Sequence, residues 1–255
     1  MYSSAVMAVI LLLICVPGIW LMSKHGASNL ANKPDQAISE KNAFTVMLLQ
    51  SFIIINLSIS AGIFFGGRIG LTDPFLEGLG QGILNWGHLI QQVCIGTLVG
   101  IVCAWGWISS YYGFIRPRMD TASVEASEQL RQQLGLATRI TSGGITEEVI
   151  FRWGLLSFAM WAIMQLIPSE TLAFWLSIIV TGVLFGLAHL PGYIEKGCVP
   201  SPMLITVVIV GNLWVSILCG YLFWQYGIIA AIIVHMLFHI LWYPWELRYN
   251  RASSS

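Results

Sequence analysis

Apolar runs of about 20 residues recur along the chain, and each is long enough to cross the roughly 30 Å of hydrocarbon in a bilayer as an α-helix. Seven such runs are visible, at about 5–22, 43–65, 89–112, 145–167, 171–190, 203–223 and 227–245. The stretches between them are polar or rich in Pro and Gly, which is typical of connections. Because backbone within lipid must satisfy its hydrogen bonds internally, the pattern predicts an all-α, polytopic transmembrane helical bundle of about seven spans, or eight.

The same pattern divides one membrane domain, 1–255, into four parts. We expect N-terminal accessory spans in 1–112, a cytoplasmic loop in 113–144, the core spans in 145–245 and a cytoplasmic tail in 246–255. Between the second and third spans, Phe75, Leu76, Leu79, Ile83 and Trp86 recur at helical spacing. They predict a short helix lying on the outer surface of the membrane.

The amino-acid composition also indicates a membrane protein. Hydrophobic residues make up 56% of the 255 positions, charged residues 9%, and the mean hydropathy is +0.76, whereas soluble domains carry roughly 25% charge. The formal net charge is zero, so nucleic acid is not an expected partner. The five cysteines are scattered without a C-x-x-C pair, and we interpret them as small apolar fillers and not as metal or redox ligands.

The distribution of Lys and Arg predicts the orientation, because cytoplasmic loops carry an excess of both. One side holds only Arg68, and Arg152 lies within a span. The other side holds the remaining ten: Lys24, Lys33, Lys41, Arg116, Arg118, Arg131, Arg139, Lys196, Arg248 and Arg251. We therefore expect an outward N-terminus, a cytoplasmic C-terminus and, in a bacterium, location in the inner (cytoplasmic) membrane.

Ionisable side chains within spans are costly and usually mark function. The fourth span opens with Glu147 and Glu148 and continues to Arg152. Residues four apart share a helix face, so Glu148 is expected to pair with Arg152 and to be structural. Glu147 has only Phe151 at that spacing and must find a partner on another span, which makes it the better candidate for a reacting carboxylate.

Three histidines and one asparagine complete the polar set within the spans. His189 ends the fifth span, and His235 and His239 lie four apart on one face of the seventh. The predicted topology brings all three histidines and Glu147 toward the inner side, so they can meet there. Asn212 in the sixth span is expected to form an interhelical hydrogen bond. His25 and His88 fall in or beside connections on opposite faces.

The order Glu-Glu-x-x-x-Arg, Phe-x-x-x-His and His-x-x-x-(Asn or Asp) on successive spans resembles the CPBP family of intramembrane endopeptidases. That family includes CaaX prenyl proteases and bacteriocin-processing or immunity proteins, also called the Abi family. The resemblance covers about 145–240. It implies an intramembrane endopeptidase that cleaves near the end of a membrane-associated or lipidated protein or peptide. The predicted orientation places its active site toward the cytoplasm.

The resemblance also implies roles for individual residues. Glu147 and His189 would activate the hydrolytic water, and His235 would stabilise the oxyanion together with the residue four positions on. That residue is usually Asn, whereas this chain has His239. A neutral imidazole can donate one hydrogen bond, so the role survives in principle.

Two other classes of function stay open at this point. Glu147, His189, His235 and His239 are also a set of four residues that can ligate zinc, although four protein ligands leave no open position for water, and H-E-x-x-H is absent. The second class is non-catalytic: an immunity or partner-binding protein, or a proton-coupled transporter. We expect no metal and no cofactor, and we expect as partners membrane lipid and a substrate with an apolar or lipidated segment.

Overall fold

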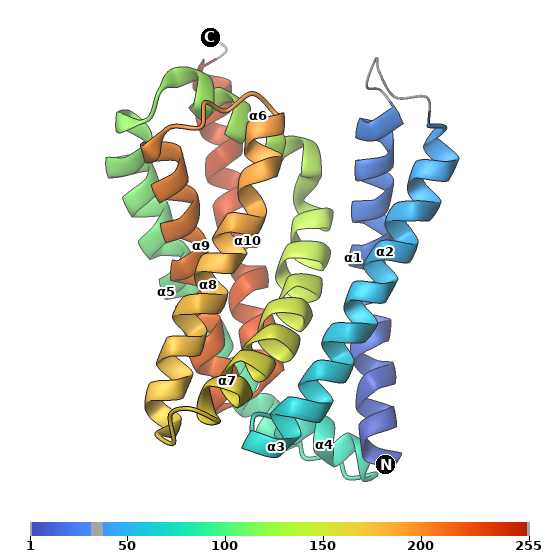
Figure 1. Ribbon diagram of the computed structural model, residues 1–255. Helices are drawn as coiled ribbons and strands as arrows, with labels where there is room; N and C mark the ends of the chain where they lie inside the picture. Colours follow the sequence, from blue (N-terminus) through green and yellow to red (C-terminus); the bar gives the residue numbers. More distant parts are fainter. Residues whose placement is uncertain (1, 32–37, 254–255) are drawn as a thin grey trace.

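The computed structural model describes residues 2–31 and 38–253, and every regular element within them is helical. Lys33 lies outside the described residues. The long helices are α1 (Tyr2–Ala31), α2 (Glu40–Ala61), α5 (Trp86–Ser110), α6 (Thr121–Thr138), α8 (Glu170–Glu195), α9 (Pro202–Gln225) and α10 (Ile228–Ser253). The short ones are α3 (Gly67–Ile69), α4 (Pro74–Gly80) and α7 (Ser157–Met164). The predicted all-α bundle is confirmed (Figure 1).

Six helical segments are long and apolar enough to cross a membrane: Ser3–Ala31, Glu40–Ile69, Trp86–Arg118, Glu170–Glu195, Pro202–Gln225 and Ile228–Tyr249. They correspond to the predicted spans other than the fourth. Several are longer than the apolar runs, because each continues into polar residues that a hydropathy pattern assigns to connections.

The predicted fourth span is helical as well, but it has an unusual geometry. Two π-helical segments, η4 (Arg139–Thr146) and η5 (Val149–Leu156), lie on either side of Glu147 and Glu148 and lead into α7. π-Helical geometry normally appears as single turns, often at functional sites. The segment lies among the other helices, since η4 contacts α1 and α10 while η5 contacts α2 and α8.

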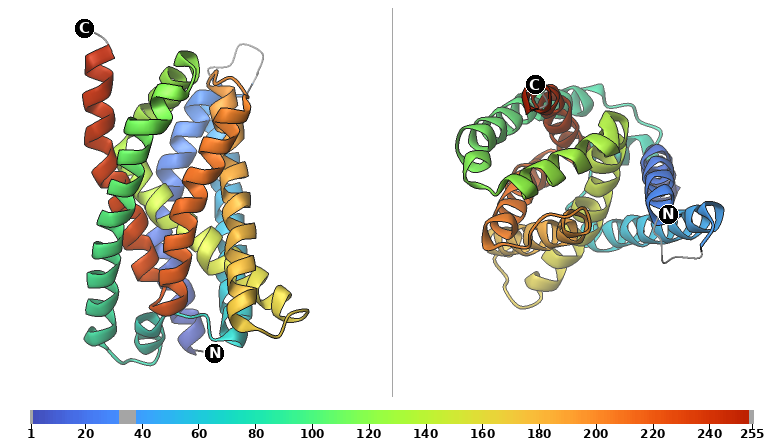
Figure 2. Two further views of the ribbon diagram at one scale, coloured as in Figure 1. Left: turned by 90° about the vertical axis from the view of Figure 1, so that its left-hand side faces the viewer. Right: turned by 90° about the horizontal axis from the view of Figure 1, so that it is seen from above.

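The connection expected over 113–144 is itself mostly helical and includes α6. Asp120 caps this helix, accepting a hydrogen bond from the Ser123 amide at 2.8 Å. In Figure 2 α6 crosses the end of the bundle that holds the C-terminus. Gly135 within α6 has φ +68°, a conformation that favours glycine, and it kinks the helix shortly before η4 begins.

Two further expectations need correction. The predicted surface helix is α4, which is shorter than the pattern suggested, and its Phe75 and Leu76 are buried against the bundle. The chain is also still helical beyond the expected boundary at residue 245, since α10 passes through Pro244 and continues to Ser253.

The helices α1 and α2 pair with one another at one side of the bundle (Figure 1). They contact the core through glycine positions, where a side chain larger than a hydrogen atom would clash with the neighbouring helix. A Cβ added at Gly62 in the turn after α2 would lie 2.2 Å from the Trp153 ring, and one at Gly18 in α1 would lie 2.4 Å from the Thr141 carbonyl oxygen. Small residues allow such close approach between membrane helices.

Candidate active site

A cavity of about 150 Å³ lies beneath α6, enclosed by η4, α8, α9 and α10. Four of its lining side chains are the candidates from the sequence, Glu147, His189, His235 and His239. A second and larger cavity, about 650 Å³, lies between α1, α2, η4, η5 and α8. Glu147 and His189 line both cavities, so they stand where the two spaces adjoin.

Glu147 and His189 face one another without a direct hydrogen bond. The Glu147 Oε1 atom is 3.9 Å from His189 Nε2, and the two side chains are 20% and 32% exposed. His189 Nδ1 is 2.8 Å from the Phe185 carbonyl oxygen. A carbonyl oxygen only accepts, so Nδ1 carries the proton and Nε2 of the neutral ring presents a lone pair toward Glu147.

Glu148 has fixed partners, in contrast to its neighbour. Its Oε1 atom is 3.1 Å from Arg152 Nη1, which confirms the predicted i,i+4 pair. The same oxygen is 2.6 Å from His235 Nδ1, a contact that the sequence did not predict. All three side chains are at most 4% exposed. Glu148 therefore holds His235 Nδ1 as the donor, so Nε2 of the neutral His235 ring is an acceptor.

His239 has the opposite tautomer. Its Nδ1 accepts a hydrogen bond from Arg139 Nε at 3.4 Å, and a guanidinium has no acceptor, so the proton of the neutral ring is on Nε2. The His235 and His239 rings stack with centroids 4.9 Å apart. A Cβ at position 143 would lie 2.6 Å from His239 Nε2, so the space facing that nitrogen depends on Gly143.

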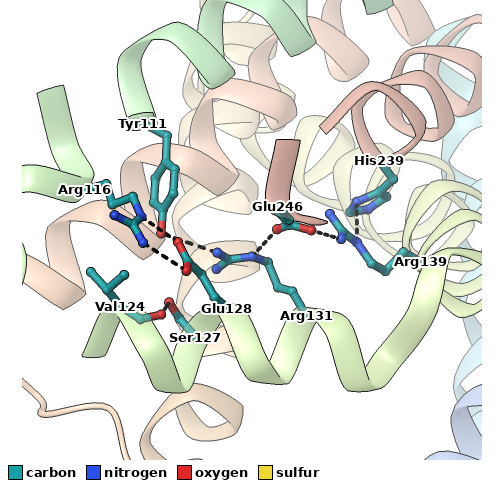
Figure 3. Close-up of polar contacts among 9 residues, drawn as sticks. All are labelled: Tyr111, Arg116, Val124, Ser127, Glu128, Arg131, Arg139, His239 and Glu246. Carbon is teal, nitrogen blue, oxygen red and sulfur yellow. Dashed lines mark hydrogen bonds and ion pairs between the residues drawn. The ribbon is translucent and has the colours of Figure 1, made fainter. Parts of the chain in front are cut away.

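Behind His239 lies an ion-pair network that joins three elements (Figure 3). Glu246 of α10 is fully buried and pairs through one oxygen with Arg131 of α6 and through the other with Arg139 of η4. Arg131 also donates to the Tyr111 hydroxyl at 3.3 Å. A carboxylate held by two guanidinium groups fixes both arginines in place.

The remaining neighbours are mostly structural. The Phe185 ring packs edge-on against His189, with centroids 4.7 Å apart, and lines the smaller cavity. Trp153 is buried and donates to the Ile59 carbonyl of α2 at 3.2 Å, so it packs η5 against α2. Asn212 was expected to bond another helix, but its amide donates to Val208 within α9 at 2.8 Å, while the residue lines the cavity. A polar side chain can satisfy itself on its own helix when no partner is within reach.

Several residues near the site were not predicted as part of it. Arg131 and Arg139 entered the sequence analysis only as cytoplasmic charges, and Glu246 was placed in the tail. His25 was placed beside a connection, whereas it lies in α1 and lines the larger cavity. The signal in the sequence was weak: His25 and Glu246 are single polar residues just beyond an apolar run, and the two arginines lie in a polar connection.

Zinc binding is the alternative use of this set of donor residues. Among the residues that the structure describes, no three His, Cys, Asp or Glu side chains are arranged to hold a metal ion. Each histidine of the cavity has its Nδ1 in contact with a protein group, namely Phe185, Glu148 or Arg139. The arrangement instead offers three acceptors, Glu147, His189 Nε2 and His235 Nε2, and one ring N–H donor, His239 Nε2.

The helices and the cavity define an integral, multi-pass membrane protein with a Glu- and His-lined site within its bundle. Residues 132–241 match the model of a family described as type II CAAX prenyl endopeptidase Rce1-like. The matched segment contains all four candidate residues together with Glu148 and Arg152, and it bears out the resemblance to the CPBP family. The match supports a CAAX-type intramembrane endopeptidase in general, with a protein or peptide substrate. Comparisons with curated proteins and with solved structures find no match.

Proposed function

We propose that the protein is a glutamic-type intramembrane endopeptidase that hydrolyses a peptide bond near the end of a membrane-associated or lipidated protein or peptide. The observation that carries the proposal is the pair Glu147 and His189, whose facing acceptor atoms are 3.9 Å apart in a cavity inside the bundle. A water molecule beside both atoms can donate one proton to each, which orients its oxygen for attack.

In this mechanism Glu147 is the general base. It removes a proton from the water as the water oxygen bonds to the scissile carbonyl carbon, and the carbonyl oxygen becomes an oxyanion. The C–N bond then breaks, and the proton held by Glu147 passes to the leaving amine. His189 orients the water through the Nε2 lone pair that its bond to Phe185 leaves free.

The two histidines of α10 would stabilise the oxyanion, but they are not equivalent donors. The Nε2–H of neutral His239 can donate as it stands, since Nδ1 accepts from Arg139. His235 donates its Nδ1–H to Glu148, so its Nε2 can donate only from an imidazolium ring. Stabilising a developing negative charge with fixed donors is usually the largest contribution to catalysis of this kind.

The larger cavity suits an apolar or lipidated substrate. Its lining includes Ile19, Met22, Leu30, Met47, Ile54, Ile55, Leu134, Ile150 and Phe151. Glu147 and His189 line the same space. An apolar segment bound there would place a neighbouring peptide bond beside the base.

The substrate can be found by comparing membranes from cells that express the wild-type protein with membranes from cells that express Glu147→Gln. Terminal peptides measured by mass spectrometry should show a shortened chain end only with the wild type. Purified wild type, and not the variant, should then generate that end from the uncut protein in detergent. Equal termini in the two membranes would favour a non-catalytic immunity or binding protein. Activity that disappears with a chelator and returns with zinc would favour the metalloprotease.

The active site is proposed to face the cytoplasm, because the end of the bundle beneath α6 carries most of the Lys and Arg residues. Gln129 on α6 is exposed, and a cysteine there, with Cys94 replaced by Ala, should resist a membrane-impermeant reagent added to intact cells. Strong labelling from outside would reverse the orientation.

A further inference from the structure

The resemblance to the CPBP family implies that His239 stands at a position where Asn is usual, and the two side chains differ in one physical respect. An Asn amide always presents N–H groups. A neutral imidazole has a single N–H that can be on either nitrogen, and the tautomer with the proton on Nδ1 would present a lone pair to an oxyanion. A histidine can replace the amide donor only if something fixes its tautomer.

We infer that Arg139 is a positioning residue that fixes His239 in the Nε2–H tautomer and aims this N–H into the cavity; the inference rests on the proposed function of His239. Arg139 Nε is 3.4 Å from His239 Nδ1 and can only donate, because a guanidinium does not lose its proton in proteins. A ring that receives this hydrogen bond on Nδ1 must keep its own proton on Nε2.

The direction of the Arg139 side chain is itself fixed. Its Nη1 pairs with a Glu246 oxygen, and its side chain is 4% exposed. The other Glu246 oxygen pairs with Arg131, so the carboxylate cannot turn away without losing two partners. Figure 3 shows the resulting row, with Glu246 between the two arginines and Arg139 reaching His239. Gly143 keeps clear the space that His239 Nε2 faces.

Arg131 provides a matched control. Arg139 and Arg131 each pair with one oxygen of Glu246, both are largely buried, and both line the smaller cavity. The hydrogen bond to His239 comes from Arg139. Replacing either arginine by Met leaves Glu246 with one guanidinium partner, so the two variants lose a similar electrostatic contact. Arg139→Met also removes the donor to His239, whereas Arg131→Met also removes the donor to the Tyr111 hydroxyl.

The test places Arg139→Met or Arg131→Met in two backgrounds, one with His239 and one with His239→Asn. For each protein, kcat on the cleaved substrate and thermal stability in detergent are measured. Arg139→Met should lower kcat about 10- to 100-fold when His239 is present. In the molecules whose His239 proton moves to Nδ1, Nε2 no longer carries the N–H that stabilises the oxyanion. In the His239→Asn background the same change should cost less than about threefold, since an amide has no tautomer to fix. Arg131→Met should have the same effect in both backgrounds.

Equal losses from Arg139→Met in both backgrounds would overturn the inference and leave Arg139 as a structural or electrostatic residue. A second readout does not depend on activity. In protein labelled with ¹⁵N-histidine, the ring signals that disappear in His239→Asn should report Nε2–H in the wild type and a shift toward Nδ1–H in Arg139→Met. Unchanged signals would also reject it. Full activity of Glu147→Gln would instead reject the proposed function and leave the tautomer measurement intact.

Discussion

Glu147 and Glu148 are neighbours in the sequence, yet their surroundings in the folded protein differ completely. Glu148 is fully buried and contacts Arg152 and His235 at 3.1 and 2.6 Å. Glu147 is 20% exposed, lines two cavities and faces His189 across 3.9 Å. A buried carboxylate that is bound to two side chains can hold them in place, whereas one that faces an open space can exchange a proton with a substrate or a water molecule.

The first way to test this comparison is to remove the charge of Glu147 at constant shape. Glu147→Gln should lower the cleavage rate by about 10²–10⁴, the range typical of a general base, because an amide cannot take the proton of the water. Thermal stability in detergent should change little, since Glu147 makes no short ion pair in the described structure. A folded Gln variant that keeps more than a tenth of the activity would contradict the assignment.

The second test concerns His239 as the hydrogen-bond donor. His239→Ala removes the ring N–H and should lower the rate by about 10²–10³, the usual cost of one oxyanion donor. His239→Asn restores N–H groups in a similar position and should keep the rate within about tenfold of the wild type. Rates and metal content are measured on the same samples. Asn and Ala variants with equal rates would remove the donor role, and zinc lost from both would favour a metal site.

The third test moves to Glu148. Glu148→Gln leaves Arg152 buried without its counter-charge, and breaking a buried pair typically costs about 3–5 kcal/mol. We expect a lower folded yield and a lower unfolding temperature. The molecules that fold should also be less active, because His235 Nδ1 loses its carboxylate partner. A yield and stability equal to those of Glu147→Gln would show that the roles of the two glutamates have been assigned wrongly.

The sequence predicted those parts of this arrangement that depend on local geometry. The spans follow from runs of apolar residues, and the pairing of Glu148 with Arg152 follows from the spacing of residues on one helix. Both are present. The prediction that Glu147 needs a partner from another span was an argument by elimination, and the structure places His189 of α8 opposite it.

Contacts between distant segments could not be predicted in the same way. His239 and Arg139 are 100 residues apart, and Arg131 and Glu246 are 115 apart. Hydropathy placed Glu246 in a tail because the apolar run ends at about residue 245. Here α10 passes through Pro244, and two arginines compensate the burial of Glu246.

The last test uses a buried carboxylate that has fixed partners but lies at the other end of the bundle. Asp73 is 0% exposed and caps α4, accepting from the Phe75 and Leu76 amides at 3.0 and 2.9 Å, and its second oxygen accepts from the Ile229 amide at 3.3 Å. Burial raises the pKa of Asp73 above its ordinary value, against the opposing effect of these hydrogen bonds. Its protonated form is therefore favoured by folding.

A carboxyl group whose pKa is raised on folding contributes fully to the free energy of unfolding at pH values below the ordinary Asp pKa of about 3.9. This contribution is lost as the pH rises through the pKa of the folded state. Asn does not titrate and is a good helix cap. Asp73→Asn should therefore remove this part of the pH dependence of the unfolding temperature above about pH 4, at a cost of about 1–3 kcal/mol, because the Asn amide nitrogen cannot accept the hydrogen bond from the Ile229 amide. The rate per folded molecule should equal that of the wild type, because Asp73 lines neither cavity. An equal dependence of the unfolding temperature on pH in wild type and variant would show that folding does not raise the pKa of Asp73. A reduced rate would show that a fixed, buried carboxylate can affect the site without touching it, which would weaken the distinction drawn between Glu147 and Glu148.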